Sequence, residues 1–118
     1  MKTIFLFILF ALPAHAIDTG RMLAALAGVE TASRDVRGRA GEATPWQLTA
    51  ATWRRYSSAP HGDPRVARTV AELHVRQCAA ELRQRGVRVT PEAIARKWNP
   101  RAPRDYVERI GNLYRATR

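Results

Sequence analysis

The chain contains a single cysteine, Cys78, so no disulfide can form within its 118 residues. A chain of this length suggests one small domain. Without a disulfide, such a domain must be held together by its apolar core alone. Cys78 lies in a helical pattern beside Val70, Leu73 and Leu82. We therefore expect it to be a small buried hydrophobe rather than a nucleophile.

The N-terminus has the parts of a secretory signal peptide. Lys2 supplies a positive charge, residues 4–12 form an apolar run, and Ala14-His15-Ala16 is a small-x-small cleavage site. The run is much shorter than the roughly 20 residues that span a bilayer. We predict a cleaved signal over 1–16 and one domain over 17–118, exported to the periplasm or secreted, with no transmembrane segment. An uncleaved core or anchoring helix is the alternative.

Apolar residues recur at helical spacing in five segments of the remaining chain. The first helix is expected over about residues 19–33. The region 35–46, with Gly38 and Gly41, is expected to form a loop or a minimal β-turn region. Short connections and the absence of strand-like alternation predict an all-α or nearly all-α domain.

Cap and stop signals predict the bounds of the four later helices. These signals are Thr49 as an N-cap, Asp63-Pro64 as the start and Gly86 as the end of a long helix, Thr90-Pro91 and Asn99-Pro100 as the start and end of the next, and Pro103 before the last.

The charge is strongly basic. After residue 16 the chain has 19 Lys and Arg and 10 acidic residues, a net charge of +9. Such a balance predicts attraction to a polyanion. For an exported protein the nearest polyanions are the cell wall and the outer surface of a membrane. Nucleic acid is the rival, and the predicted export argues against it.

Glu30 is the candidate for chemistry. It follows Leu23 and Leu26 at helical spacing, so it borders the apolar stripe of the first helix. A carboxyl group there loses hydration, which raises its pKa, as a general acid for glycosidic cleavage requires. From spacing alone, a helix-end carboxylate paired with Arg34 remains the alternative. His61 and His74 stand alone in the sequence, and no cluster with metal-ligand spacing is present.

The segment around Glu30 resembles a known motif. Leu26-Ala27-Gly28-Val29-Glu30-Thr31 is similar to the segment in which lytic transglycosylases of the soluble type, members of the lysozyme-like superfamily, carry their catalytic glutamate. In that family the glutamate ends a helix and is usually followed by serine. Thr31 keeps the hydroxyl.

Three later segments resemble the other motifs of this family, in the family's order. In the segment 41–53, Gln47 and Trp53 match the family motif and Thr44 stands where a glycine is usual. In the segment 95–100, Trp98 replaces a tyrosine, Asn99 is retained and Pro100 follows in place of small residues. The segment 106–110 is similar to a Tyr-Val-x-Arg-Val helix.

The resemblance implies a small lysozyme-like domain that cleaves the β-1,4 bond between N-acetylmuramic acid and N-acetylglucosamine. Glu30 would protonate the glycosidic oxygen and then act as base on the muramyl 6-hydroxyl, giving a 1,6-anhydro product. No cofactor or metal would be needed, and the partner of the expected monomer would be a peptidoglycan strand. The implied substrate-binding residues are Thr31, Gln47, Trp98, Asn99 and Tyr106.

Three alternatives stay open. The chain could be a catalytically inactive, basic wall-binding module on the same fold, or a helical periplasmic adaptor without a sugar site. If Asp35 or Glu42 positioned a water molecule, it would be a lysozyme-type hydrolase. Asp35 as a plain loop residue is the favoured interpretation.

Overall fold

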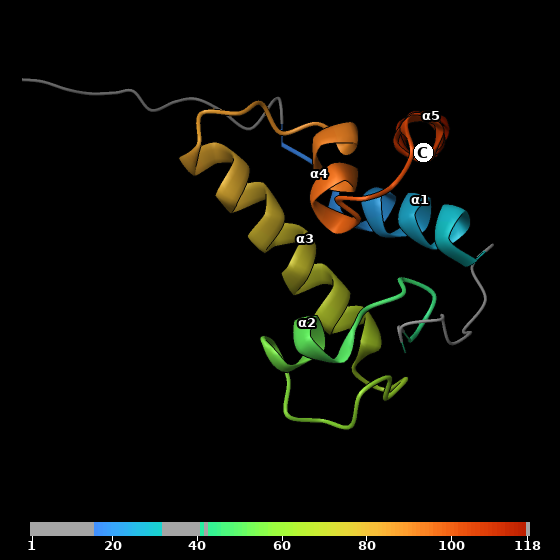
Figure 1. Ribbon diagram of the computed structural model, residues 1–118, viewed down its shortest axis with the longest axis vertical. Helices are drawn as coiled ribbons and strands as arrows, with labels where there is room; N and C mark the ends of the chain where they lie inside the picture. Colours follow the sequence, from blue (N-terminus) through green and yellow to red (C-terminus); the bar gives the residue numbers. More distant parts are fainter. Residues whose placement is uncertain (1–15, 32–40, 42, 118) are drawn as a thin grey trace, which may run out of the picture.

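The computed structural model describes residues 16–31, 41 and 43–117, which contain five α-helices and no sheet (Figure 1). The all-α prediction is confirmed. One isolated antiparallel bridge, between Ala43 and Leu48, lies at the edge of the predicted β-turn region. The helices are α1 (Thr19–Thr31), α2 (Ala50–Arg54), α3 (Ala67–Gln84), α4 (Pro91–Trp98) and α5 (Arg104–Ala116).

Some predictions fall on residues outside this described part. They are the signal peptide, except for its last residue Ala16, residues 35–40 and 42 of the predicted loop or β-turn region, and the roles of Arg34, Asp35 and Glu42. Within the part that the structure describes, no helix is long and apolar enough to cross a membrane.

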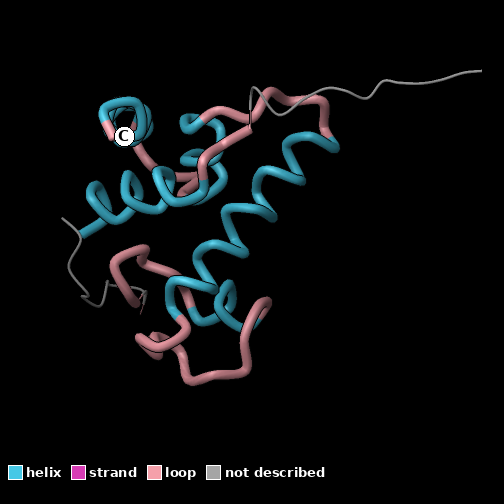
Figure 2. Tube along the Cα trace, turned by 180° about the vertical axis from the view of Figure 1, so that it is seen from behind, coloured by secondary structure: helices cyan, strands magenta, loops and turns pink. Residues whose placement is uncertain are grey.

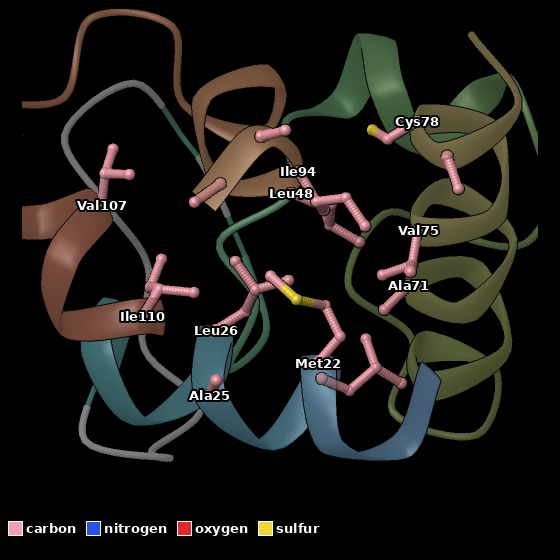
Figure 3. Packing of buried hydrophobic residues seen from close by; sticks show 14 of the residues in the cluster. Met22, Ala25, Leu26, Leu48, Ala71, Val75, Cys78, Ile94, Val107 and Ile110 are labelled. Atoms are coloured by element: carbon pink, nitrogen blue, oxygen red, sulfur yellow. The ribbon is translucent and has the colours of Figure 1, made fainter. Parts of the chain in front are cut away.

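Four of the helices enclose the core. α1 packs against α3 and α5, and α4 packs against the same two helices. Met22 and Leu26 of α1 point into the core between Val75 of α3 and Ile110 of α5 (Figure 3). All four side chains are at most 1% exposed. Full burial of such a side chain stabilises the fold by roughly 1.5–3 kcal/mol, so this core fixes α1 against α5.

The end of α5 closes onto the start of α1. The hydroxyl of Tyr114 accepts a hydrogen bond from the Asp18 N–H at 3.0 Å, and the guanidinium of Arg21 donates to the Tyr114 carbonyl at 2.7 Å. Asp18 also caps α1, because its Oδ1 accepts the N–H of Arg21 at 3.0 Å. The two helices are thereby joined at one end as well as through the core.

Local cap and stop signals are confirmed at Thr49, Gly86, Thr90, Asn99 and Pro103. Thr49 Oγ1 accepts the N–H of Thr52 at 3.2 Å and begins α2, and Thr90 accepts the N–H of Ala93 at 3.1 Å and begins α4. Gly86 follows the end of α3 with a φ of 71°, in the left-handed region that favours glycine.

The predicted start of the long helix at Asp63-Pro64 is wrong. The Asp63 carboxylate accepts the N–H of Arg65, two residues on, at 2.9 Å, and its carbonyl accepts the N–H of Val66 at 3.2 Å. These bonds close a separate turn. α3 begins at Ala67, after Val66, which provides no side-chain cap.

Candidate functional site

The centre of the candidate site is a hydrogen bond between two helices. The hydroxyl of Tyr106, in the first turn of α5, donates to Oε2 of Glu30, the penultimate residue of α1. Tyr106 is buried and Glu30 is half-buried. The structure therefore brings together the implied catalytic residue and one of the implied substrate-binding residues, although 76 positions separate them in the sequence.

Tyr106 is held as a hydrogen-bond donor. Burial raises the pKa of the Tyr106 phenol far above its ordinary value, and the hydrogen bond to Glu30 and its negative charge raise it further, against a smaller opposing effect of Arg109. The hydroxyl consequently keeps its proton throughout the physiological pH range.

Gln47 lies in the tight turn closed by Ala43 and Leu48. Its Nε2 donates to the carbonyl of Thr44 at 2.9 Å, and its backbone N–H donates to the same oxygen at 3.1 Å. Both Thr44 and Gln47 have positive φ, 74° and 53°. The Gln47 side chain thus stabilises the turn in which it lies.

Two tryptophans connect this turn to the helices. The indole N–H of Trp98, at the end of α4, donates to the carbonyl of Trp46 at 3.0 Å. The indole N–H of Trp46 in turn donates to the carbonyl of Leu23 in α1 at 2.9 Å. α4, the turn and α1 are therefore linked directly. Any sugar contact of Trp98 would have to use the face or edge of its ring.

The remaining implied substrate-binding residues lie at the C-terminal ends of two helices. Asn99 follows α4, where its N–H donates to the carbonyl of Ala95 at 3.0 Å and its own carbonyl accepts from Ala102 at 3.1 Å. Its side chain is half-buried. Thr31 is the last residue of α1, and its side chain lies outside the described part of the structure.

A polar cluster that the sequence did not predict lies between α3 and α4. His74 is not isolated, because its Nδ1 is 2.8 Å from the hydroxyl of Tyr56 and its Nε2 is 3.9 Å from the sulfur of Cys78. Its ring also packs on Trp98, with centroids 4.7 Å apart. The spacing of His74 and Cys78, one helical turn apart, was the only available sequence signal.

Burial dominates the chemistry of this cluster. It lowers the pKa of His74 to about 4 and raises the pKa of Cys78 to about 11. The thiol is buried and stays protonated, in agreement with the predicted role of Cys78 as a small core residue. No three potential metal ligands come together among the described residues.

No protein-family model, curated protein or solved structure was found to match this chain. A carboxyl group that is half-buried at a helix end and hydrogen-bonded to a protonated phenol can give and take a proton in general acid–base catalysis.

Proposed function

We propose that this chain is a lytic transglycosylase that cleaves the β-1,4 bond between N-acetylmuramic acid and N-acetylglucosamine in peptidoglycan. The observation that carries the proposal is the hydrogen bond from Tyr106 to Glu30. It joins two of the four segments that resemble this family. The net charge of the chain, +10, also favours a polyanionic substrate such as the cell wall.

In the first step Glu30 acts as the acid. Its proton passes to the glycosidic oxygen as the bond from that oxygen to the muramyl C1 breaks. The substrate's own N-acetyl group stabilises the cationic centre, so no second carboxylate is required. A positioned proton donor of this kind contributes roughly 10²–10⁴-fold to the rate.

In the second step Glu30 acts as the base. Its carboxylate takes the proton of the muramyl 6-hydroxyl while the oxygen of that hydroxyl bonds to C1 and closes the 1,6-anhydro ring. Glu30 is then protonated again, ready for the next cycle. The hydrogen bond from Tyr106 favours the charged carboxylate, so it supports this half of the reaction and orients the group between the two steps.

The backbone of Thr44 supports the resemblance on which the proposal also depends. Thr44 stands where the family usually has a glycine, and its φ of 74° lies in the region that glycine adopts without strain. The turn thus keeps the conformation that a glycine would allow, although the side chain of Thr44 is larger than that of glycine. We propose that Thr31, Gln47, Trp98 and Asn99 contact the sugar next to Glu30.

The test is clearance of a purified peptidoglycan suspension by the wild-type protein and by Glu30→Gln. We expect the variant to lose about 10²-fold or more of the activity, because the amide can neither give nor take the proton. Glu108→Gln is the matched control, since Glu108 is an exposed carboxylate on α5. Circular dichroism should show the same helix content for all three proteins.

Mass analysis of the released fragments identifies the reaction. Anhydro ends, one water lighter than hydrolysed ends, support the transglycosylase. Hydrolysed ends would identify a lysozyme-type hydrolase instead. Wall binding by the wild type without release of fragments would identify an inactive binding module, and undiminished lysis by Glu30→Gln would end the proposal.

A further inference from the structure

The C-terminal end of α3 and the turn after it form a basic tip, residues 83–88. Arg83, Arg85 and Arg88 are exposed, and no acidic residue occurs between 82 and 91. The ion pairs among the described residues include none of these three arginines. The basic tip therefore presents an uncompensated positive charge to solvent.

The nearest acids along the chain are already paired. Glu81 lies 2.8 Å from Lys97 and 3.8 Å from Arg55, and it also accepts a hydrogen bond from Gln77 at 2.9 Å. On the other side, Glu92 pairs with Arg115 at 2.7 Å. Neither acid neutralises the basic tip, so its charge is available for an external anion.

An apolar side chain stands among these charges. Val87 is 44% exposed, one of only a few large apolar residues in the described chain with so much surface in water. Its N–H donates to the carbonyl of Leu82 at 2.9 Å, and Gly86 takes the left-handed conformation just before it. The backbone of the turn is thus fixed with Val87 directed outward between arginines.

We propose that the basic tip binds the surface of an anionic phospholipid bilayer. The three arginines would contact headgroup phosphates, and Val87 would enter the interface between headgroups and acyl chains. Nucleic acid fits the same surface less well. Residues 83–88 contain no aromatic side chain on which a base could stack, and a valine gains nothing from a phosphodiester backbone.

The position of the basic tip suits a bilayer contact. The C-terminal end of α3 lies on the opposite side of the molecule from the C-terminal end of α1, which carries Glu30 (Figures 1 and 2). A bilayer at the tip would leave Glu30 uncovered. The inference does not depend on the proposed reaction, because it rests on other residues and is measured by binding.

The test is co-sedimentation with vesicles of phosphatidylcholine alone or mixed with phosphatidylglycerol. We expect binding to the mixed vesicles only, weakened by salt. Each arginine near the surface should contribute about fivefold, so Arg83→Gln/Arg85→Gln/Arg88→Gln should bind about a hundredfold more weakly. The control with the same loss of net charge replaces three paired arginines elsewhere, Arg65→Gln/Arg104→Gln/Arg109→Gln.

An environment-sensitive thiol label at Val87→Cys reports insertion without removing any arginine. Cys78 is buried and should not be labelled, so the label would be confined to the introduced thiol. Its emission should shift to the blue with mixed vesicles, and the same label at Asn112→Cys, on the exposed part of α5, should not respond.

Four results would overturn the inference. The first is an equal loss of binding in both triple variants, which would indicate attraction by net charge alone. The second is no response of the label at position 87 to mixed vesicles. The third is equal binding to both kinds of vesicle. Binding to a DNA duplex at the affinity seen with mixed vesicles, without a label response, would identify a nucleic-acid surface instead and would also overturn it.

Discussion

The side-chain amide of Gln47 bonds to the carbonyl of Thr44 across a turn in which both residues have positive φ. A left-handed conformation costs a residue with a β-carbon about 1–2 kcal/mol, and a β-branched residue such as threonine is especially unfavourable there. The turn persists because Ala43 and Leu48 exchange two backbone hydrogen bonds, of 3.0 and 2.9 Å. The strain lies in the loop that is bonded to the carbonyl of Leu23 in α1 through Trp46.

This strain predicts which of two variants at position 44 is the more stable. Thr44→Gly should be more stable than Thr44→Ala by about 1 kcal/mol, because both lose the hydroxyl that accepts the N–H of Trp46 but only glycine relieves the positive φ. The measurement is the free energy of unfolding from chemical denaturation.

A helical position should show the reverse order. Ala24 is exposed within α1, and Ala24→Gly should destabilise the fold by about 1 kcal/mol. If Thr44→Ala were instead the more stable of the two variants at position 44, the strain attributed to this turn would be absent.

Local signals predicted most of the helices. Thr49 and Thr90 cap helices because the N–H that each accepts lies only three residues away, within the same stretch of sequence. Asp63 carried the same kind of signal but forms a separate turn, because an aspartate can also bond the N–H two residues on. Local sequence alone does not decide between these two bonds.

The candidate site depended on information that is not local. Spacing placed Glu30 at the border of an apolar stripe, but only the resemblance to known motifs suggested Tyr106 as its neighbour. The His74 cluster was missed because Tyr56 and Trp98 reach it from other parts of the chain. Contacts of this kind require the tertiary arrangement of the helices.

Protonation of His74 should lower the stability of the fold in acid. The pKa of His74 is about 4 in the folded protein, against an ordinary value of 6.5 that we take for the unfolded chain. Burial, Arg55 and Lys97 disfavour the charged imidazole more than Glu81 favours it. The unfolded chain therefore binds more protons between these values. The stability is fully present above about pH 6.5 and is lost as the pH falls towards 4.

We expect this effect to lower the free energy of unfolding by about 2 kcal/mol between about pH 7 and about pH 5. His74→Gln offers an amide oxygen to the Tyr56 hydroxyl but cannot titrate, so its stability should change less over the same interval. Denaturant unfolding at several pH values measures both proteins. Parallel curves for the two would show that another group is responsible.

Tyr106→Phe tests the contact that carries the proposed function. It removes one hydroxyl and leaves the buried ring, so the core should keep its packing. A hydrogen bond to a charged group contributes about 1.5–3 kcal/mol. If the transition state loses this contribution, turnover of peptidoglycan should fall about 10- to 100-fold. KM should change little, because the partner of the hydroxyl is the Glu30 carboxyl group.

Tyr56→Phe is the matched control, because it removes a hydroxyl that bonds at 2.8 Å to the neutral His74 and not to Glu30. It should cost about 1 kcal/mol of stability and leave turnover almost unchanged. The two variants thus separate a general loss of stability from loss of the Glu30 partner. If the loss of activity in each variant only followed its loss of stability, Tyr106 would serve only the fold. The assignment of Glu30 as the reacting carboxyl group would then lose its main support.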